Sequence, residues 1–460
     1  MNQFDSLDLH QNIAAALASA GFVQMTAVQA ATLPDTLAGR DVMVQASTGS
    51  GKTIAFAVAG LQHIDATDFR TQLLVLCPTR ELAAQVSDQI RLVGRQIANL
   101  KVLTLCGGEP MGPQIQSLKH GASVVVATPG RLLDHVGKRT LSLAHVKVRV
   151  LDEADRMLDM GFADDMATLF ALTPKQAQTL FFSATYTEQV EQEAQRYLTN
   201  PIEHRQVTED LQKPDIDQLV YRVDENNRLQ VLKGILSEYQ PGKAVVFCNR
   251  RDQVTVVYEA LLAAGFTVLP LQGEMTQPQR NEVLVQFASE CLQVLVATDV
   301  AARGLDVKDI DCVINYAVSE ESEVHIHRIG RTGRAGAKGA AYTLCSEAEE
   351  PALGRIEALL DTTLVRKSGQ SLRFHANRIC DPAFSCIAIG AGKKQKLRPT
   401  DFLGSLTQDA GIEGTDIGKI TVQSQVSFVA VKQRSVKRAL KLFREGRIKG
   451  KKVRARKAGL

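Results

Sequence analysis

The chain has 460 residues, which is too many for one ordinary hydrophobic core, so about three domains are expected. Hydrophobic residues make up 45% of it and charged residues 23%, and no apolar run approaches a membrane span of ~20 residues, which excludes an integral membrane protein. The net charge of +4 conceals an asymmetry, because residues 381–460 carry 18 Lys and Arg against 6 Asp and Glu, whereas the rest carries 36 against 44. A basic end on a mildly acidic body indicates a polyanionic partner.

The eight cysteines include no CxxC pair and no Cys/His cluster at zinc spacing. Cys77, Cys248 and Cys312 lie within or beside apolar runs, which is typical of buried, reduced thiols. The N-terminus lacks the basic stretch and apolar run of a signal peptide. These features predict a cytoplasmic protein.

Residues from about 20 to 205 alternate apolar, strand-like runs with helix-like stretches. After a short run at 42–44, the candidate strands lie at 73–77, 102–105, 123–127, 147–151 and 179–183. This alternation is typical of an open parallel sheet with helices on both faces. We therefore expect a first α/β domain over residues 1–208.

A glycine-rich turn follows the first candidate strand and leads into a helix-like stretch. It consists of Ala46, Ser47, Thr48, Gly49, Ser50, Gly51, Lys52 and Thr53. The glycines permit backbone angles that point N–H groups at phosphate oxygens, and the helix start adds a positive dipole end. In such a loop Lys52 contacts the β- and γ-phosphates and the Thr53 hydroxyl ligates Mg²⁺. The turn predicts a nucleoside triphosphate site, although Ala46 replaces the usual first glycine.

Two carboxylates follow the candidate strand at 147–151. Asp152 is placed to hold Mg²⁺, directly or through water, and Glu153 to orient or activate the attacking water. Such a pair alone is usually a solvated loop or a helix cap, but the phosphate loop upstream favours hydrolysis. Ser183 and Thr185 end the next candidate strand with two hydroxyls, for which a functional role and a simple cap are equally open.

Three other strands of this block end in residues that suit a phosphate backbone. Arg80 follows the second strand, Gly108 the third, and Thr128 with Arg131 the fourth. Loops at the carboxyl ends of parallel strands line the ligand crevice of an open sheet. Since each loop offers charge, a hydroxyl or close backbone approach, together they predict contacts to a nucleic-acid backbone.

A polar segment with a proline, at 209–215, is a candidate linker. Beyond it the candidate strands lie at 244–248, 267–271, 293–297, 311–315 and 340–345, which predicts a second α/β domain over 216–370 without a phosphate loop. Glycines separate Arg328, Arg331 and Arg334 there. Arginine binds phosphate oxygens through two N–H groups, and one supplied to a γ-phosphate is worth about 10³–10⁵ in rate in other NTPases. We therefore expect one nucleotide site where the two domains meet.

The last block, 380–460, has a different rhythm. Its candidate strands lie at 386–389, 419–422 and 426–431 and its candidate helices at 399–408 and 436–443. A β-α-β-β-α-β order predicts a small α+β domain. Cations at helical spacing form one basic face, extended by the tail: Arg434, Lys437, Arg438, Lys441, Arg444, Lys449, Lys451, Lys452, Arg454, Arg456 and Lys457. The excess of charge favours polyanion binding over a merely solvated helix.

The chain resembles the DEAD-box RNA helicases over residues 1 to about 370. The matching motifs, in order, are Gln29, ASTGSGKT at 46–53, PTRELA at 78–83, GG at 107–108, TPGR at 128–131, DEAD at 152–155, SAT at 183–185, VFCN at 246–249, Gln277 with Arg280, ATDVAARGLDV at 297–307 and HRIGRTGR at 327–334. The tail is similar to the DbpA/YxiN branch through Gly392, Lys393, Lys394, Lys396, Arg398, Pro399 and residues 417–420. The resemblance implies two tandem RecA-like parallel-sheet domains plus a small C-terminal α+β RRM-like domain, with ATP and Mg²⁺ as cofactors.

The resemblance also implies roles for the matching residues. Phe4 would stack on the base, Thr26 and Gln29 would read the adenine edge, and Asp306 would contact the ribose. Lys52, Thr53, Asp152 and Glu153 would bind and hydrolyse ATP, with Arg331 and Arg334 completing the site, and Ser183, Thr185 and His327 would couple hydrolysis to strand separation. The RNA contacts would be Arg80, Gly108, Thr128, Arg131, Thr298, Gly304, Lys393, Lys394, Arg434, Lys437, Arg438, Lys441, Lys451 and Lys452. One departure is Met25, where the family usually has proline before Thr26.

These roles describe an RNA-dependent ATPase that unwinds short RNA duplexes. The branch implies a hairpin of 23S ribosomal RNA as the target, in pre-50S particles during assembly of the large ribosomal subunit. The third candidate strand of the last block, 426–431, has Phe428 but no aromatic-rich pattern, which disfavours base stacking across the sheet. No coiled-coil seam is present, so a monomer is expected. A DNA translocase and a non-catalytic RNA-binding scaffold stay open as alternatives, although Gln29 disfavours the first and intact Lys52 and Glu153 the second.

Overall fold

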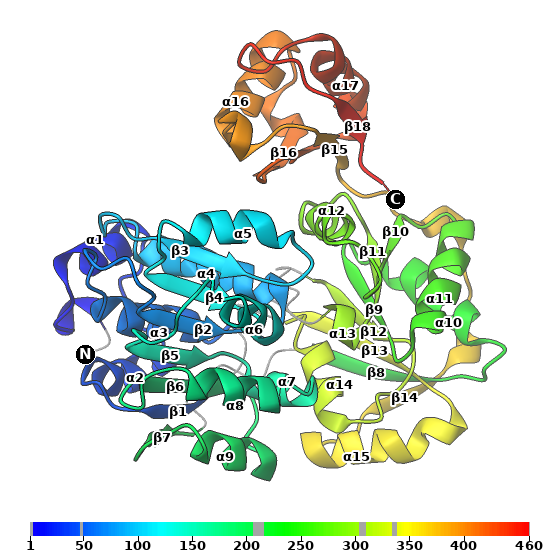
Figure 1. The fold of residues 1–460 in the computed structure, drawn as a ribbon. Coiled ribbons are helices and arrows are strands. Elements are labelled where there is room, and N and C mark those ends of the chain that lie inside the picture. Colours follow the sequence, from blue (N-terminus) through cyan, green and yellow to red (C-terminus); the bar gives the residue numbers. More distant parts are fainter. Residues whose placement is uncertain (1–2, 47–48, 206–215, 303–309, 334–337, 460) are drawn as a thin grey trace. The chain divides into compact units, whose positions relative to one another are not determined.

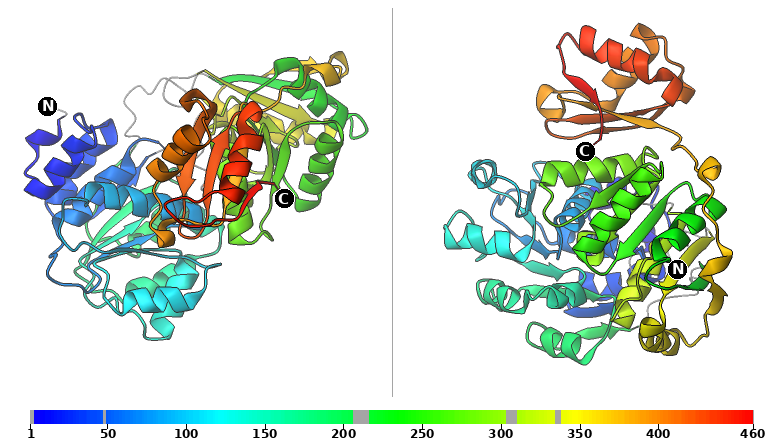
Figure 2. Two further views of the ribbon diagram at one scale, coloured as in Figure 1. Left: turned by 90° about the horizontal axis from the view of Figure 1, so that it is seen from above. Right: turned by 90° about the vertical axis from the view of Figure 1, so that its right-hand side faces the viewer.

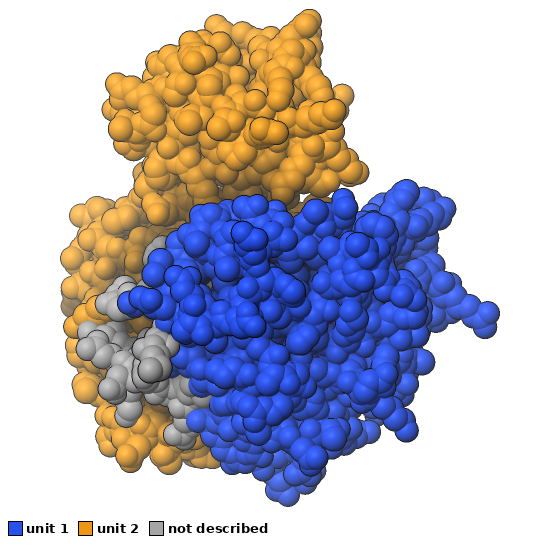
Figure 3. Space-filling model, turned by 90° about the vertical axis from the view of Figure 1, so that its left-hand side faces the viewer, with its two compact units in different colours: residues 1–211 blue, residues 212–460 orange. Residues whose placement is uncertain are grey.

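The structure, a computed structural model, describes residues 3–46, 49–205, 216–302, 310–333 and 338–459. Residues 1–211 and 212–460 form two compact units, which Figure 3 colours separately. The candidate linker at 209–215 lies outside the described residues. Within the described ranges, no helix is both long enough and apolar enough to span a membrane.

A parallel sheet of seven strands forms the centre of the first unit (Figure 1). In spatial order the strands are β3 (Val102–Leu105), β4 (Val124–Ala127), β2 (Leu73–Leu76), β5 (Val148–Leu151), β6 (Gln178–Ser183), β1 (Val42–Gln45) and β7 (Ile202–His204). The central strands are buried along their whole length, as the continuous Leu and Val runs of a sheet covered on both faces require. The strands predicted in this block are confirmed, and only the three-residue β7 was missed.

Helices cover both faces of this sheet. They are α1 (Gln11–Ser19), α2 (Ala27–Leu37), α3 (Lys52–Gln62), α4 (Arg80–Val93), α5 (Met111–Leu118), α6 (Pro129–Gly137), α7 (Ala154–Asp159), α8 (Ala163–Ala171) and α9 (Glu188–Gln195). Val44 packs with Phe56 of α3 in one core, whereas its neighbour Met43 packs with Met166 of α8 in the other. Two cores on opposite faces hold the strand ends in fixed places.

The second unit contains a similar parallel sheet. Its order is β10 (Val268–Leu271), β11 (Val294–Thr298), β9 (Ala244–Cys248), β12 (Cys312–Asn315), β13 (Gly339–Cys345), β8 (Ile216–Arg222) and β14 (Val365–Ser368). The helices are α10 (Arg228–Tyr239), α11 (Arg251–Ala263), α12 (Gln277–Ala288), α13 (Asp299–Ala302), α14 (Ser322–Ile329) and α15 (Glu350–Leu360). The five predicted strands are confirmed, and β8 and β14 were missed.

Residues 385–457, which we call the C-terminal module, follow in the same unit (Figure 2). An antiparallel sheet has the order β16 (Ile417–Val422), β17 (Ser427–Val431), β15 (Ser385–Ile389) and β18 (Ala455–Lys457). Helices α16 (Pro399–Gly404) and α17 (Val436–Glu445) pack on one face of it, with Phe402 and Phe443 in the core. The predicted fold class, two parallel-sheet domains plus a small α+β domain, is confirmed.

Candidate functional site

The sheet order of the first unit sorts the predicted motifs into two groups. Strands β5, β6 and β1 are neighbours, and they lead into the DEAD motif, the SAT motif and the phosphate loop. Strands β3, β4 and β2 are neighbours too, and they lead into Gly108, Thr128 and Arg80. Since the carboxyl ends of parallel strands share one edge of a sheet, the nucleotide residues gather on one side of that edge and the nucleic-acid residues on the other.

The phosphate loop depends on two glycines. Gly49 and Gly51 have φ angles of 92° and 89°, in the left-handed region, and α3 begins at Lys52 directly after them. A Cβ on Gly51 would lie 2.6 Å from Gln29 Nε2 and 2.8 Å from Thr26 Oγ1. Only glycine therefore fits this turn, and the free N–H groups at the start of α3 are those that a phosphate needs.

Lys52 and Asp152 form a buried ion pair in the first unit. Lys52 Nζ lies 2.8 Å from Asp152 Oδ1, and the two side chains are 5% and 0% exposed. Burial raises the pKa of the Asp152 carboxyl. Burial alone would lower the pKa of Lys52, but the carboxylates of Asp152 and Glu153 outweigh it, so that pKa is raised. The pair holds a charged lysine beside the strand end where the triphosphate is expected.

Glu153 adopts a backbone conformation that is unusual for a residue with a side chain. Its φ is 58° and its ψ 54°, and it precedes α7. The buried Glu153 carboxylate accepts a hydrogen bond from Arg156 Nη1 at 2.7 Å. A left-handed non-glycine residue costs roughly 1–3 kcal/mol and is typical of active sites. Arg156, which the sequence analysis did not single out, thus orients the predicted catalytic carboxylate.

Asp155 connects the DEAD motif to the SAT motif. Its Oδ2 accepts hydrogen bonds from Ala184 N at 3.1 Å, Thr185 N at 3.1 Å and Thr185 Oγ1 at 3.2 Å. The buried Ser183 hydroxyl has no hydrogen-bond partner among the described residues. The sequence analysis assigned no role to Asp155, although a third acid in the same four-residue motif was an available signal.

The predicted adenine-reading residues are tied to the phosphate loop. Thr26 caps α2, and its Oγ1 donates to the Ser50 carbonyl at 2.8 Å. Gln29 Nε2 donates to the Gly51 carbonyl at 3.0 Å, and Gln29 Oε1 accepts from Thr26 N at 2.8 Å. A change in the conformation of the phosphate loop would therefore alter the hydrogen bonds of Gln29. Recognition of adenine by Thr26 and Gln29 stays a prediction.

Two other residues from the N-terminal segment lie in the hydrophobic core. Phe4 is 4% exposed and Met25 8% exposed, and both belong to the cluster that includes Val28 of α2. Met25 fills core space where the family has proline, and stacking of Phe4 on a base stays a prediction. The predicted residues outside the described part of the chain are Ser47, Thr48, Gly304, Asp306 and Arg334.

The structure brings the predicted RNA contacts of the first unit together. A Cβ on Gly108 would lie 1.8 Å from Arg80 Nη1, so the Arg80 guanidinium lies directly against this glycine. Arg131 Nη1 donates to the Glu109 carbonyl at 3.0 Å. Thr128 stands at the N-cap of the helix that carries Arg131. Two guanidinium groups thus converge on one glycine turn, a geometry that suits a phosphate.

In the second unit, Arg328 has a structural role. Its guanidinium is buried and donates to both carboxylate oxygens of Asp299 at 2.7 Å and to Asn249 Oδ1 at 2.7 Å. These bonds fasten α14 to the segments that follow β9 and β11. Arg331 lies two residues beyond the end of α14 and Thr298 ends β11, and both are buried. Arg328 therefore positions the arginine motif.

His325, also on α14, is expected to make the folding stability of the second unit sensitive to acid. Neither ring nitrogen has a hydrogen-bond partner among the described residues, and burial lowers the pKa of His325 to about 4. The unfolded chain titrates near 6.5 and binds more protons between these values, so the free energy of unfolding falls as the pH drops through this window. Between pH 7 and pH 5 we expect a loss of about 2 kcal/mol.

Urea unfolding at both pH values measures this loss. His325→Gln should remove most of it, and His375→Gln, at an exposed histidine of the same unit, should not. An unchanged pH dependence in His325→Gln would contradict the assignment.

The C-terminal module contains a pocket lined by cations. Its volume is about 440 Å³, and its lining residues are Lys393, Lys396, Leu397, Arg398 and Lys449. Lys449 Nζ donates to the Lys396 carbonyl at 3.4 Å and Lys451 Nζ to the Gln395 carbonyl at 3.0 Å. These bonds join the basic stretch at 393–398 to the basic stretch at 449–452. Lys393 was a predicted RNA contact, and the pocket adds three more cations around it.

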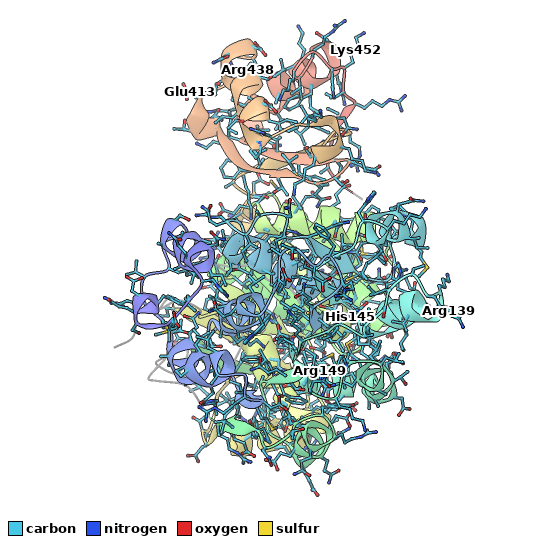
Figure 4. All side chains as sticks on the ribbon, turned by 60° about the vertical axis from the view of Figure 1, so that its left-hand side comes forward. Arg139, His145, Arg149, Glu413, Arg438 and Lys452 are labelled. Atoms are coloured by element: carbon cyan, nitrogen blue, oxygen red, sulfur yellow. The ribbon has the colours of Figure 1, made fainter. Side chains whose placement is uncertain are left out.

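The cations on and near α17 differ in their surroundings. Lys437, Arg438 and Lys441 are exposed, and Arg438, labelled in Figure 4, donates from Nη1 to the Gly411 carbonyl at 3.4 Å. Arg434 instead donates to Asp416 Oδ2 at 2.7 Å and to Oδ1 at 2.5 Å, which holds the pKa of that carboxyl well below its usual range. Arg434 therefore links β16 to the start of α17 within the module.

Comparisons with known proteins agree with this arrangement. The DEAD/DEAH box helicase family matches residues 26–193 and the helicase conserved C-terminal domain matches residues 226–336. The DbpA RNA binding domain matches residues 386–457. The chain is 46% identical to the ATP-dependent RNA helicase DbpA of Escherichia coli (strain K12), with 95% of each chain covered. The chain belongs to the DEAD-box ATP-dependent RNA helicases.

Other similarities support the same family. This helicase is 33% identical to the ATP-dependent RNA helicase DbpA of Bacillus subtilis (strain 168) over the whole of both chains. It also resembles S. cerevisiae Dbp5 bound to RNA and ADP BeF3, with a TM-score of 0.74, 28% identity and coverage of 81% and 97%. For Mss116p bound to ssRNA and AMP-PNP the TM-score is 0.70, the identity 27% and the coverage 80% and 79%. Membership of this enzyme family decides against a DNA translocase and against a non-catalytic scaffold.

Proposed function

We propose that this helicase unwinds short duplexes of 23S ribosomal RNA during assembly of the large (50S) subunit, and that its C-terminal module selects the RNA. The observation that carries the proposal is the cation-lined pocket within the segment matched by the DbpA RNA binding domain. The partners of the helicase would be pre-50S particles, and the helicase would act as a monomer. All eight cysteines are free, which suits the cytoplasm.

The chemistry of the pocket suits a nucleotide in an RNA loop. Its volume of about 440 Å³ lies within the usual range for small-ligand sites, about 300–1,000 Å³. Lys393, Lys396, Arg398 and Lys449 supply the charge for neighbouring phosphates. Hairpin loops present unstacked nucleotides, which are the usual targets of specific RNA recognition. The exposed cations of α17 would add non-specific attraction to the backbone.

For ATP hydrolysis, we propose that Lys52 leaves Asp152 to bind the phosphates. Asp152 Oδ2 is buried without a hydrogen-bond partner among the described residues, and it fits Mg²⁺ together with the Thr53 hydroxyl. No cluster of three His, Cys, Asp or Glu side chains occurs in the described ranges, so water and phosphate oxygens would complete the ligand set. When bound, the ion neutralises charge on the phosphates.

The remaining roles follow from the chain itself. Glu153, oriented by Arg156, holds the attacking water and takes its proton. Arg331 and Arg334 would stabilise charge on the γ-phosphate from the second unit. Asp155 would transmit the state of the DEAD motif to Thr185, because its carboxylate holds both the backbone and the hydroxyl of that residue.

Asp155→Ala is therefore expected to separate hydrolysis from unwinding. The variant loses an acceptor of three hydrogen bonds, and bonds to a charged group contribute roughly 1.5–3 kcal/mol each. We expect strand separation to fall at least 30-fold and ATP turnover to fall less than fivefold, measured on one short fluorescent RNA duplex. Thr185→Val should cause a smaller change of the same kind, and Asp164→Ala on α8 should cause none. Equal losses of hydrolysis and unwinding would refute the coupling role.

ATP hydrolysis by the full chain with 23S rRNA, 16S rRNA or poly(A), at one salt concentration, tests the proposed target. We expect half-maximal stimulation at a concentration of 23S rRNA at least tenfold lower than that of the other two. Equal stimulation by all three would leave the helicase activity in place and overturn the ribosomal target.

A further inference from the structure

Two buried polar side chains meet beside the glycine turn at 107–108 of the first unit. Gln114 of α5 is 7% exposed, and His135 of α6 is completely buried. His135 Nε2 lies 2.9 Å from Gln114 Oε1. The sequence analysis assigned no role to either residue, and neither belongs to one of the matched motifs. Because polar groups are costly to bury unless they are hydrogen-bonded, the partners of this pair show what it does.

Gln114 connects the glycine turn to Arg131. Its Nε2 donates to the Cys106 carbonyl, directly before the turn, at 3.2 Å, and its Oε1 accepts from Arg131 Nη1 at 2.9 Å. Arg131 Nη1 also donates to the Glu109 carbonyl, directly after the turn, at 3.0 Å. The turn is therefore held on both sides. Since Nη1 has two hydrogens, both are used, and a phosphate would bind the remaining N–H groups of the guanidinium.

The chemistry of the donors fixes where the protons of this cluster lie. Arginine only donates, so the Gln114 oxygen faces Arg131 and the Gln114 nitrogen faces the carbonyl. That oxygen only accepts, so His135 donates to it from Nε2, and the other ring nitrogen is an acceptor. The Thr140 hydroxyl, 2.8 Å from His135 Nδ1, supplies the hydrogen, because the His135 carbonyl already accepts from Thr140 N at 3.0 Å. Burial, together with the nearby Arg131, lowers the pKa of His135, which keeps the ring neutral as this arrangement requires.

We propose that Gln114 and His135 are positioning residues, which hold the Arg131 guanidinium in the orientation that binds an RNA phosphate. The inference rests on the proposed RNA contact of Arg131. A long side chain loses rotamer freedom when it binds, and a guanidinium that is already fixed loses less. Asp134 is a weaker support, because its carboxylate is 57% exposed and lies 3.4 Å from Arg131 Nε. The pair should therefore affect how tightly RNA binds and leave the hydrolysis step unchanged.

The test measures ATP hydrolysis by the full chain at increasing concentrations of poly(A) and one salt concentration. Poly(A) is a suitable probe because contacts to the RNA backbone do not depend on sequence. We expect Gln114→Leu to raise the concentration for half-maximal stimulation about tenfold or more, because the charged Arg131 loses an acceptor. Turnover at saturating poly(A) should stay within twofold of that of the natural sequence.

Substitutions of His135 separate its hydrogen bond from its bulk. His135→Leu fills a similar volume without an N–H group, and we expect it to raise the half-maximal concentration about fivefold. His135→Gln again offers an N–H group to Gln114 and should stay within twofold of the natural sequence. His120→Leu, at an exposed histidine just after α5, is the matched control and should change nothing.

A double-mutant cycle shows whether Gln114 acts through Arg131. Arg131→Ala should raise the half-maximal concentration at least as much as Gln114→Leu does. In the Arg131→Ala background, Gln114→Leu should add less than threefold, because the group that it positions is already absent. Independent effects would instead multiply.

Each other outcome overturns a defined part of the inference. A raised half-maximal concentration in Arg131→Ala with an unchanged one in Gln114→Leu would overturn the positioning role alone. Multiplying effects in the cycle, or a lowered turnover at saturating poly(A), would show that Gln114 only stabilises the fold, and would overturn the role as well. If Arg131→Ala itself had no effect, the proposed RNA contact of Arg131 would fail, and its positioning with it.

Discussion

Glu153→Gln is expected to lower RNA-stimulated ATP turnover by about 10²–10⁴-fold while ATP and RNA binding stay within threefold, because the variant removes only the group that accepts the proton. Gln keeps the size of Glu and still accepts a hydrogen bond from Arg156, which is 2.7 Å from the native carboxylate. The left-handed backbone at this position is unchanged by the substitution. The predicted loss is therefore chemical.

Phosphate release at saturating RNA, alongside nucleotide and RNA binding titrations, measures this effect. The first unit offers a matched control in Glu193, a buried glutamate that pairs at 2.9 Å with an arginine three residues on, as Glu153 does. Glu193→Gln should leave turnover within twofold. Normal hydrolysis in Glu153→Gln would show that another group activates the water, and a parallel loss of nucleotide binding would show a disturbed site.

The sequence predicted those parts of the fold that carry their own local signal. Continuous apolar runs identified the central strands of both parallel sheets, because such strands are buried on both faces. Edge strand β14 reads Val365-Arg366-Lys367-Ser368, and most of it faces away from the core. Its identity as a strand comes from pairing with β8, which no local pattern reveals. The short edge strand β7 was missed for the same reason.

In the functional site, too, features with a local sequence signal were predicted, and features that depend on tertiary contacts were not. The phosphate loop and the pair Asp152–Glu153 were found from sequence because each is one short segment with its own chemistry. The roles of Asp155 and Arg156 depend on β5 and β6 being neighbours and on a turn conformation at Glu153, and these are tertiary facts. The charge count of residues 381–460 alone predicted that this part of the chain binds a polyanion, and the DbpA RNA binding domain matches residues 386–457.

Individual cations of that tail could not be assigned from the sequence. Arg434 pairs with an aspartate 18 residues away, and Arg456 with a glutamate 174 residues away. Both arginines contribute to the basic composition, yet each is held by a carboxylate that no helical spacing could have indicated. The exposed cations of the pocket and those of α17 form two separate sets within the module, which leads to a sharper prediction.

The triple variant Lys393→Ala, Arg398→Ala, Lys449→Ala should weaken binding of the RNA target by about 100-fold or more, since charge-assisted contacts contribute roughly 1.5–3 kcal/mol each. Because the three side chains that the variant removes are polar and exposed, the free energy of unfolding should change little. The salt dependence of RNA binding should also become shallower, by a slope of about 2 for three lost contacts to single-stranded RNA.

A matched variant separates specific recognition from simple charge. Lys437→Ala, Arg438→Ala, Lys441→Ala removes the same charge from the same module, but from the exposed face of α17. We expect it to weaken 23S rRNA and poly(A) equally, because it removes contacts that do not read the RNA, whereas the pocket variant should abolish the preference for 23S rRNA. The concentration of each RNA that half-maximally stimulates ATP hydrolysis, measured at several salt concentrations, distinguishes the two. If the pocket variant kept its preference and the α17 variant lost it, the address would lie on the helix, and the pocket would be only one more source of positive charge.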